Sequence, residues 1–138
     1  MKRTLSLSLA LGISMLFQSL LAQRLTLEVR NIEKPVGAMY VGLYNSWESF
    51  MKQPVASFAR AVNDTLMVVV CNGLPPGEYA VSLFHDENNN GRLDAGNYGI
   101  PLEKYGVSNN AKGRMGHPTY RQCAFALRSD TLLVIGLQ

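Results

Sequence analysis

The stretch RLTLEVR at residues 24–30 decides the fold class, because its apolar side chains recur at every second position. Leu25, Leu27 and Val29 alternate with polar residues, which is typical of a strand with one buried face. Similar patterns and short apolar runs predict further strands at residues 36–44, 55–62, 65–71, 78–85, 120–128 and 131–137. The sequence therefore predicts an all-β fold, an antiparallel β-sandwich of about seven strands.

Turn-forming residues separate these predicted strands. Asn63-Asp64 predicts a tight turn, and Ser129-Asp130 predicts a hairpin between the last two strands. Asn45 and Glu48 resemble a helix N-terminal capping box, so we expect one or two helical turns that end at Pro54. Gly37 and Gly42 interrupt the second strand and indicate a bend or a close packing contact there.

The N-terminus resembles a secretory signal peptide at residues 1–22. Lys2 and Arg3 precede an apolar run at residues 5–21, and the small residue Ala22 suits a cleavage site. The run is short and contains polar residues, which favours a cleaved signal over a membrane span. We therefore expect one domain at residues 23–138, exported to the periplasm, cell surface or medium, with no membrane span after cleavage.

The charge of the exported chain excludes two classes of partner. The formal net charge of the whole chain is +3, and it falls to +1 when Lys2 and Arg3 leave with the signal. A nearly neutral chain is not suited to binding nucleic acid or an anionic membrane surface. The expected partner is an unidentified protein or glycan of the cell envelope.

Residues 86–119 form a long segment with little strand pattern, which holds 6 of the 12 glycines. Segments of this kind inside a compact domain are usually functional or disordered. The segment opens with DENNNGRLD at residues 86–94, which matches the first nine positions of an EF-hand-type calcium loop. The candidate ligands are Asp86, Asn88, Asn90, Arg92 (through its carbonyl oxygen) and Asp94. Gly91 permits the sharp turn of such a loop, and Leu93 is expected to anchor it in the core.

The twelfth position of the loop falls on Asn97, where a high-affinity site has a bidentate glutamate. Another oxygen, from Glu87 or Glu103, is needed to complete the coordination shell. With two certain carboxylates, we expect weak Ca²⁺ binding, with a dissociation constant of about 10⁻⁴–10⁻³ M. The alternative is an asparagine- and glycine-rich turn that its own side chains cap without an ion.

Three blocks of sequence resemble one bacterial family. They are residues 74–81 (LPPGEYAV), residues 85–94 (HDENNNGRLD) and residues 99–110, where Gly99-Ile100-Pro101 leads to Ser108-Asn109-Asn110. Together they are similar to the "domain of unknown function 2141" family, over roughly residues 25–137. The resemblance implies an exported β-sandwich of transthyretin-like or immunoglobulin-like type. It implies no catalytic residues, and the chain is expected not to be an enzyme.

Other functions remain open at the level of sequence. Asp86 and Glu103 form a possible acid pair of a small periplasmic hydrolase, and Trp47 is a possible platform of a carbohydrate-binding module. Cys71 and Cys123, the only cysteines, form either a disulfide or two buried thiols. His85 is expected to fix the mouth of the loop by hydrogen bonding.

Overall fold

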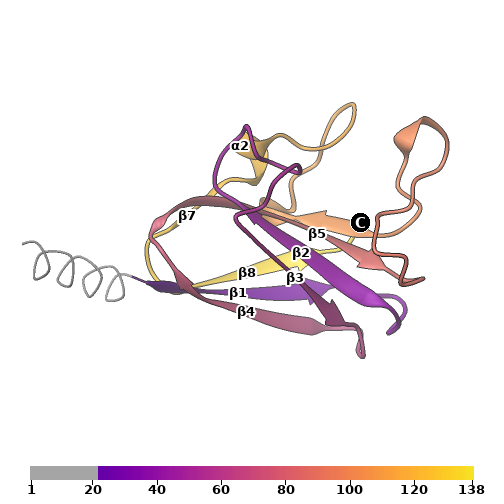
Figure 1. The fold of residues 1–138 in the computed structure, drawn as a ribbon, viewed down its shortest axis with the longest axis horizontal. Helices are drawn as coiled ribbons and strands as arrows, with labels where there is room; N and C mark the ends of the chain where they lie inside the picture. The colour runs from indigo at the N-terminus through magenta and orange to yellow at the C-terminus, as the bar shows by residue number, and fades with distance from the viewer. Residues whose placement is uncertain (1–21) are drawn as a thin grey trace, which may run out of the picture.

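A computed structural model describes residues 22–138, which fold into two β-sheets that pack against each other (Figure 1). The strands are β1 (Gln23–Arg30), β2 (Ala38–Tyr44), β3 (Ala56–Ala61), β4 (Met67–Leu74), β5 (Gly77–Asp86), β6 (Tyr105–Val107), β7 (Phe125–Leu127) and β8 (Thr131–Gly136). One sheet has the order β4-β1-β8, and the other has the order β3-β2-β5-β6, with β7 also paired to β5. The predicted β-sandwich is confirmed. The predicted signal peptide, apart from Ala22, lies outside the described residues.

The main core lies between the two sheets and follows the alternation seen in the sequence. Leu25, Leu27 and Val29 of β1 are fully buried, and Val81 and Leu83 of β5 face them from the other sheet. Burying each such side chain stabilises the fold by about 1.5–3 kcal/mol. The period-two pattern thus sets which face of each strand points inward.

A second, smaller core covers part of the outer face of the five-stranded sheet. It contains Tyr44, Phe50, Ala80, Val107 and Cys123. The β2–β3 connection and the short helix α2 (Tyr120–Cys123) supply its outer layer. This arrangement holds the long segment after β6 against the sheet.

The prediction for residues 120–128 was wrong in two respects. Tyr120–Cys123 is a helical turn, because the Thr119 hydroxyl accepts a bond from the Gln122 N–H and the Gln122 side chain accepts one from the Thr119 N–H. In addition, β7 and β8 do not form a hairpin, since β7 pairs with β5 and β8 pairs with β1. The β1–β8 pair is parallel, so the sandwich is not antiparallel throughout.

Two other segments differ from the sequence-based expectation. Residues 45–54 form turns without a regular helix, and Ser46, not Asn45, caps them by accepting a bond from the Ser49 N–H. The segment after β5 is not structureless: it contains β6 and the 3₁₀ turns η1 (Asn97–Gly99) and η2 (Ser108–Asn110). The buried Ser108 hydroxyl joins η2 to the backbone of Val81 in β5.

Both cysteines are free thiols in the structure. Cys71 packs at the margin of the main core, whereas Cys123 is fully buried in the second core. Cys123 lies on α2, although the sequence predicted a strand at residues 120–128. Burial raises the pKa of Cys71 and raises that of Cys123 to about 11, so both thiols are protonated at neutral pH.

Within residues 22–138, no helix is long and apolar enough to cross a bilayer.

Candidate functional site

The candidate site is the loop that leaves β5 at Asp86, and Asp86 organises its first turn. The Asp86 side chain is fully buried although it is a carboxylate. Its Oδ1 accepts a bond of 3.1 Å from the Asn90 N–H, and its Oδ2 accepts one of 2.8 Å from the Gly91 N–H. Gly91 has φ +78°, the left-handed conformation that the sharp turn needs. The predicted sharp turn at Gly91 therefore matches the observed geometry, and Asp86, predicted as an ion ligand, caps this turn through its two oxygens.

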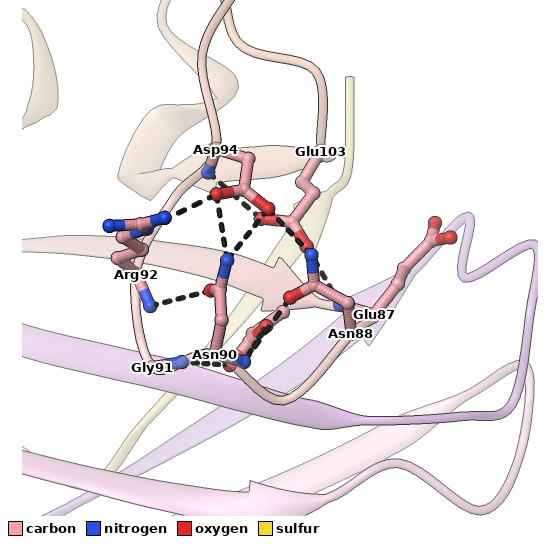
Figure 2. A network of polar contacts seen from close by, with 8 residues as sticks. Glu87, Asn88, Asn90, Gly91, Arg92, Asp94 and Glu103 are labelled. Atoms are coloured by element: carbon pink, nitrogen blue, oxygen red, sulfur yellow. Dashed lines mark hydrogen bonds and ion pairs between the residues drawn. The ribbon is translucent and has the colours of Figure 1, made fainter.

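The side chains of Asn88, Asn90 and Asp94 meet inside the loop (Figure 2). The Asn88 amide donates a bond of 2.6 Å to Asp94 Oδ2. The Asn90 amide donates to both Asp94 oxygens, at 2.8 and 2.9 Å. The loop therefore brings three polar side chains of the motif to one point.

Glu103, from the middle of the segment, closes the loop. Its Oε1 accepts a bond of 3.0 Å from the Glu87 N–H, and its Oε2 accepts one of 3.0 Å from the Asp94 N–H. In Figure 2 the Glu87 side chain points away from the cluster, and its carboxylate pairs with Lys34 Nζ at 2.7 Å. Of the two candidates for completing a coordination shell, Glu103 is the one that the fold brings to the site.

Arg92, Leu93 and Asn97 are the other named positions of the motif, and Leu93 alone lies differently from the expectation. The Arg92 guanidinium is near the Asp94 carboxylate, with Nε 3.4 Å from Oδ1, although its side chain remains 79% exposed. Leu93 does not enter the core, because it lines a hollow on the outer face of the five-stranded sheet. Asn97, at the twelfth position, is exposed in η1 and takes no part in the cluster.

Two residues outside the motif hold the loop against the sheet. His85 is fully buried, and its Nε2 lies 2.7 Å from the Val36 carbonyl oxygen, a bond of the kind expected for it. Gly37 has φ +70°, and a Cβ there would lie 2.9 Å from the Glu87 Cα. The sequence indicated a close contact at Gly37 but did not identify its partner, since the two positions are 50 residues apart.

Hard oxygen atoms make the cluster chemically suited to calcium. Each carboxylate oxygen of Asp86 and Glu103 accepts one backbone N–H and has a second lone pair available. The amides of Asn88 and Asn90 now donate to Asp94, and their oxygens accept the N–H groups of Asn90 and Arg92. A rotation about Cβ–Cγ would present these oxygens to an ion and would break both sets of bonds. Among residues 22–138, no three His, Cys, Asp or Glu side chains are grouped closely enough to hold an ion, so these amide oxygens are essential.

The same hydrogen bonds lower the pKa of Asp94 below its ordinary value of 3.8, with Asn90 the largest cause and Asn88 the next. A lowered carboxyl pKa contributes stability at higher pH, and this contribution is lost as pH falls below 3.8 through the folded-state pKa. We expect a carbon-13 NMR titration of the ion-free protein to give an Asp94 pKa that Asn90→Ala raises. Asn89→Ala should leave the pKa unchanged, and an equal rise in both variants would contradict this assignment.

Comparison with known proteins identifies the family of the chain. Residues 27–133 match the profile of a family described as "Uncharacterized protein conserved in bacteria (DUF2141)". The chain belongs to this family. The match confirms the resemblance inferred from the sequence blocks around the loop, and the matched residues include all six candidate ligands of the DUF2141 domain. No curated protein and no solved structure matches the chain.

The alternative functional residues are not arranged as their functions require. The carboxylates of Asp86 and Glu103 both accept backbone N–H groups, and Asp86 is inaccessible to a substrate. Trp47 is 73% exposed, whereas the neighbouring aromatic residues Tyr44 and Phe50 are buried in the second core. The geometry therefore favours neither an acid pair at the loop nor a sugar platform built on Trp47.

Proposed function

We propose that this protein is an exported, non-enzymatic binding or accessory module of the cell envelope whose loop at residues 86–97 binds calcium weakly. The observation that carries the proposal is that Asn88 and Asn90 converge on the Asp94 carboxylate, while the carboxylates of Asp86 and Glu103 hold the backbone of the same loop. Export rests on the signal-like N-terminus, and the envelope role rests on export and the nearly neutral charge.

The ion would replace the bonds that the asparagine amides now make to Asp94. Those bonds satisfy the loop without an ion, which is the self-capped turn that the sequence left as an alternative. Binding requires the two amides to rotate and the exposed Arg92 side chain to move away from Asp94. Both changes involve exposed side chains on the loop, so they leave the sheet unaltered.

We expect calcium to stabilise the folded protein. An ion that binds only the folded state adds RT ln(1 + [Ca²⁺]/Kd), so calcium at about 100 times Kd adds about 2.7 kcal/mol to the free energy of unfolding. The measurement is thermal unfolding of the purified protein in calcium and in chelator. Magnesium at the same concentration controls for ionic strength and should have a smaller effect, since it prefers a rigid octahedral shell.

Two variants separate a bound ion from a general salt effect. Asp94→Ala removes the carboxylate on which both amides converge and should abolish the calcium response. Asn89→Ala changes a neighbouring exposed residue at φ +58° that is outside the ligand pattern and should retain the response. A calcium response that survives in Asp94→Ala would refute the assignment of the site.

A further inference from the structure

Part of the outer face of the five-stranded sheet carries a row of aromatic side chains next to the loop at residues 86–97, which we call the calcium loop. Tyr105 of β6 pairs with Phe84 of β5, Phe84 pairs with Tyr40 of β2, and Tyr40 pairs with Ala59 of β3. The rings of Tyr40 and Phe84 are stacked, with centroids 5.0 Å apart and planes within 4°. All three aromatic side chains are only partly buried, so the row is accessible from the solvent.

Two adjoining hollows open on this face. The first, of about 350 Å³, lies over β2, β3 and β5, and the second, of about 250 Å³, lies over β5 and β6. Tyr44, Ser82 and Phe84 line both hollows, so the two lie side by side on this face, and we call the pair the groove. Met51, Leu93 and His117, which lie on three different connections between strands, also line the second hollow. Figure 1 shows the long connections that leave the five-stranded sheet.

The floor of the groove is shaped by small residues. A Cβ at Gly42 would lie 2.7 Å from the Tyr44 hydroxyl, so the absence of a side chain at Gly42 lets the Tyr44 ring lie across β2. Ser57 and Ser82 flank Gly42 on the neighbouring strands. Larger side chains at these three positions would fill the hollow, and the sequence places small ones at all of them.

The lining combines aromatic surface with polar groups that are free to bind. The hydroxyls of Tyr40, Tyr44, Ser57, Ser82 and Tyr105 make no hydrogen bond within residues 22–138. None of the residues that line the two hollows is Asp, Glu, Lys or Arg. A charged ligand would lose its hydration there without gaining an opposite charge, and a purely aliphatic ligand would leave the hydroxyls unpaired.

We infer that this groove binds a neutral saccharide. The ring of a sugar presents apolar C–H groups on its faces and hydroxyls around its edge, which complement aromatic rings and unpaired hydroxyls. The inference specifies the ligand of the binding module proposed above and rests on that proposal. It does not require the calcium ion, because β2, β3, β5 and β6 supply the floor and the aromatic row of the groove.

The calcium loop nevertheless lies next to this groove. A Cβ at Gly91 would lie 3.7 Å from the Tyr40 hydroxyl, and Leu93 lines the second hollow. An ion that orders the loop therefore also fixes Gly91 and Leu93 beside the groove. We therefore expect calcium to tighten saccharide binding by a few-fold, without being required for it.

The test uses the purified protein and an array of neutral oligosaccharides built from glucose, galactose, mannose and N-acetylglucosamine. Uronic-acid and sulfated oligosaccharides are included to test charged ligands. A dodecyl maltoside–dodecanol pair is included to test aliphatic ligands. The best neutral ligand is then titrated at up to millimolar concentration and followed by amide NMR shifts, in calcium and in chelator. We expect saturable binding, with the largest shifts on Tyr40, Ser82 and Phe84 in both conditions.

Two substitutions locate the binding. Ser82→Leu fills the floor shared by both hollows and should weaken binding at least tenfold, while Ser129→Leu makes the same change on an exposed turn and should have no effect. Tyr40→Phe removes one hydroxyl with little change in packing and should weaken binding several-fold. The inference is overturned if no neutral oligosaccharide binds, if charged or aliphatic ligands bind better, or if Ser82→Leu leaves affinity unchanged. Failure of the thermal calcium response, with saccharide binding retained, would refute the ion site and leave the groove intact.

Discussion

Asp86→Ala should lower the free energy of unfolding by about 3 kcal/mol in chelator, and it should remove any further stabilisation by calcium. The buried carboxylate accepts the N–H groups of Asn90 and Gly91, and bonds to a charged group contribute about 1.5–3 kcal/mol each. The exposed N–H groups of the variant can bond to water. The expected loss is therefore close to twice the lower value for one such bond. Chemical denaturation of wild type and variant, each with and without calcium, measures both effects.

Asp86→Asn separates hydrogen bonding from charge at the same position. Its amide retains one acceptor oxygen, so we expect it to recover roughly half of the loss in chelator. It should not restore the calcium response, because the site then has one carboxylate fewer. If Asp86→Asn binds calcium as wild type does, the negative charge of Asp86 does not contribute to the site.

Gly37→Ala is the second substitution with a large expected effect. The left-handed φ of +70° at this position costs an alanine about 1–2 kcal/mol. The new Cβ would also press on the backbone of Asp86 and Glu87, and overpacking of this kind costs about 1–3 kcal/mol. We therefore expect a loss of about 3 kcal/mol, measured by chemical denaturation, together with weaker calcium binding because the entrance of the loop is displaced.

Gly73→Ala is the matched control for Gly37→Ala. Gly73 has nearly the same φ, +72°, but a Cβ there would have no heavy atom within 4 Å. This variant should show the backbone strain alone, about 1–2 kcal/mol, and leave calcium binding unchanged. Equal losses in the two variants would show that the contact between Gly37 and the loop does not contribute.

Much of the strand pattern was predictable because strands such as β1 bury every second side chain. The alternation in β1 and β5 sets which side chains enter the core, and the structure places them there. The three residues of β6 are too few to show a period, and they lie in a segment rich in glycine and asparagine. Residues 120–123 show how a local capping pair, Thr119 with Gln122, prevails over an apolar pattern that resembles a strand.

The site was predictable to the extent that its residues are close in sequence. The spacing predicted that the polar side chains of the loop converge, and those of Asn88, Asn90 and Asp94 do. The Asp86 side chain instead accepts the backbone N–H groups of Asn90 and Gly91. The choice between Glu87 and Glu103 depended on Lys34, which pairs with Glu87 and lies far from it in sequence. The aromatic groove was not predicted, because Tyr40, Phe84 and Tyr105 become neighbours only through strand register.

One measurement tests the calcium site most directly: an amide NMR titration of the wild-type protein with calcium. We expect a single saturable transition with a dissociation constant of about 10⁻⁴–10⁻³ M. The largest shifts should fall on the backbone amides of Glu87, Asn90, Gly91 and Asp94, whose N–H groups bond to the Asp86 and Glu103 carboxylates. Shifts that stay linear and small to about ten times that concentration, or that spread evenly over the surface, would show that the loop is a self-capped turn without an ion.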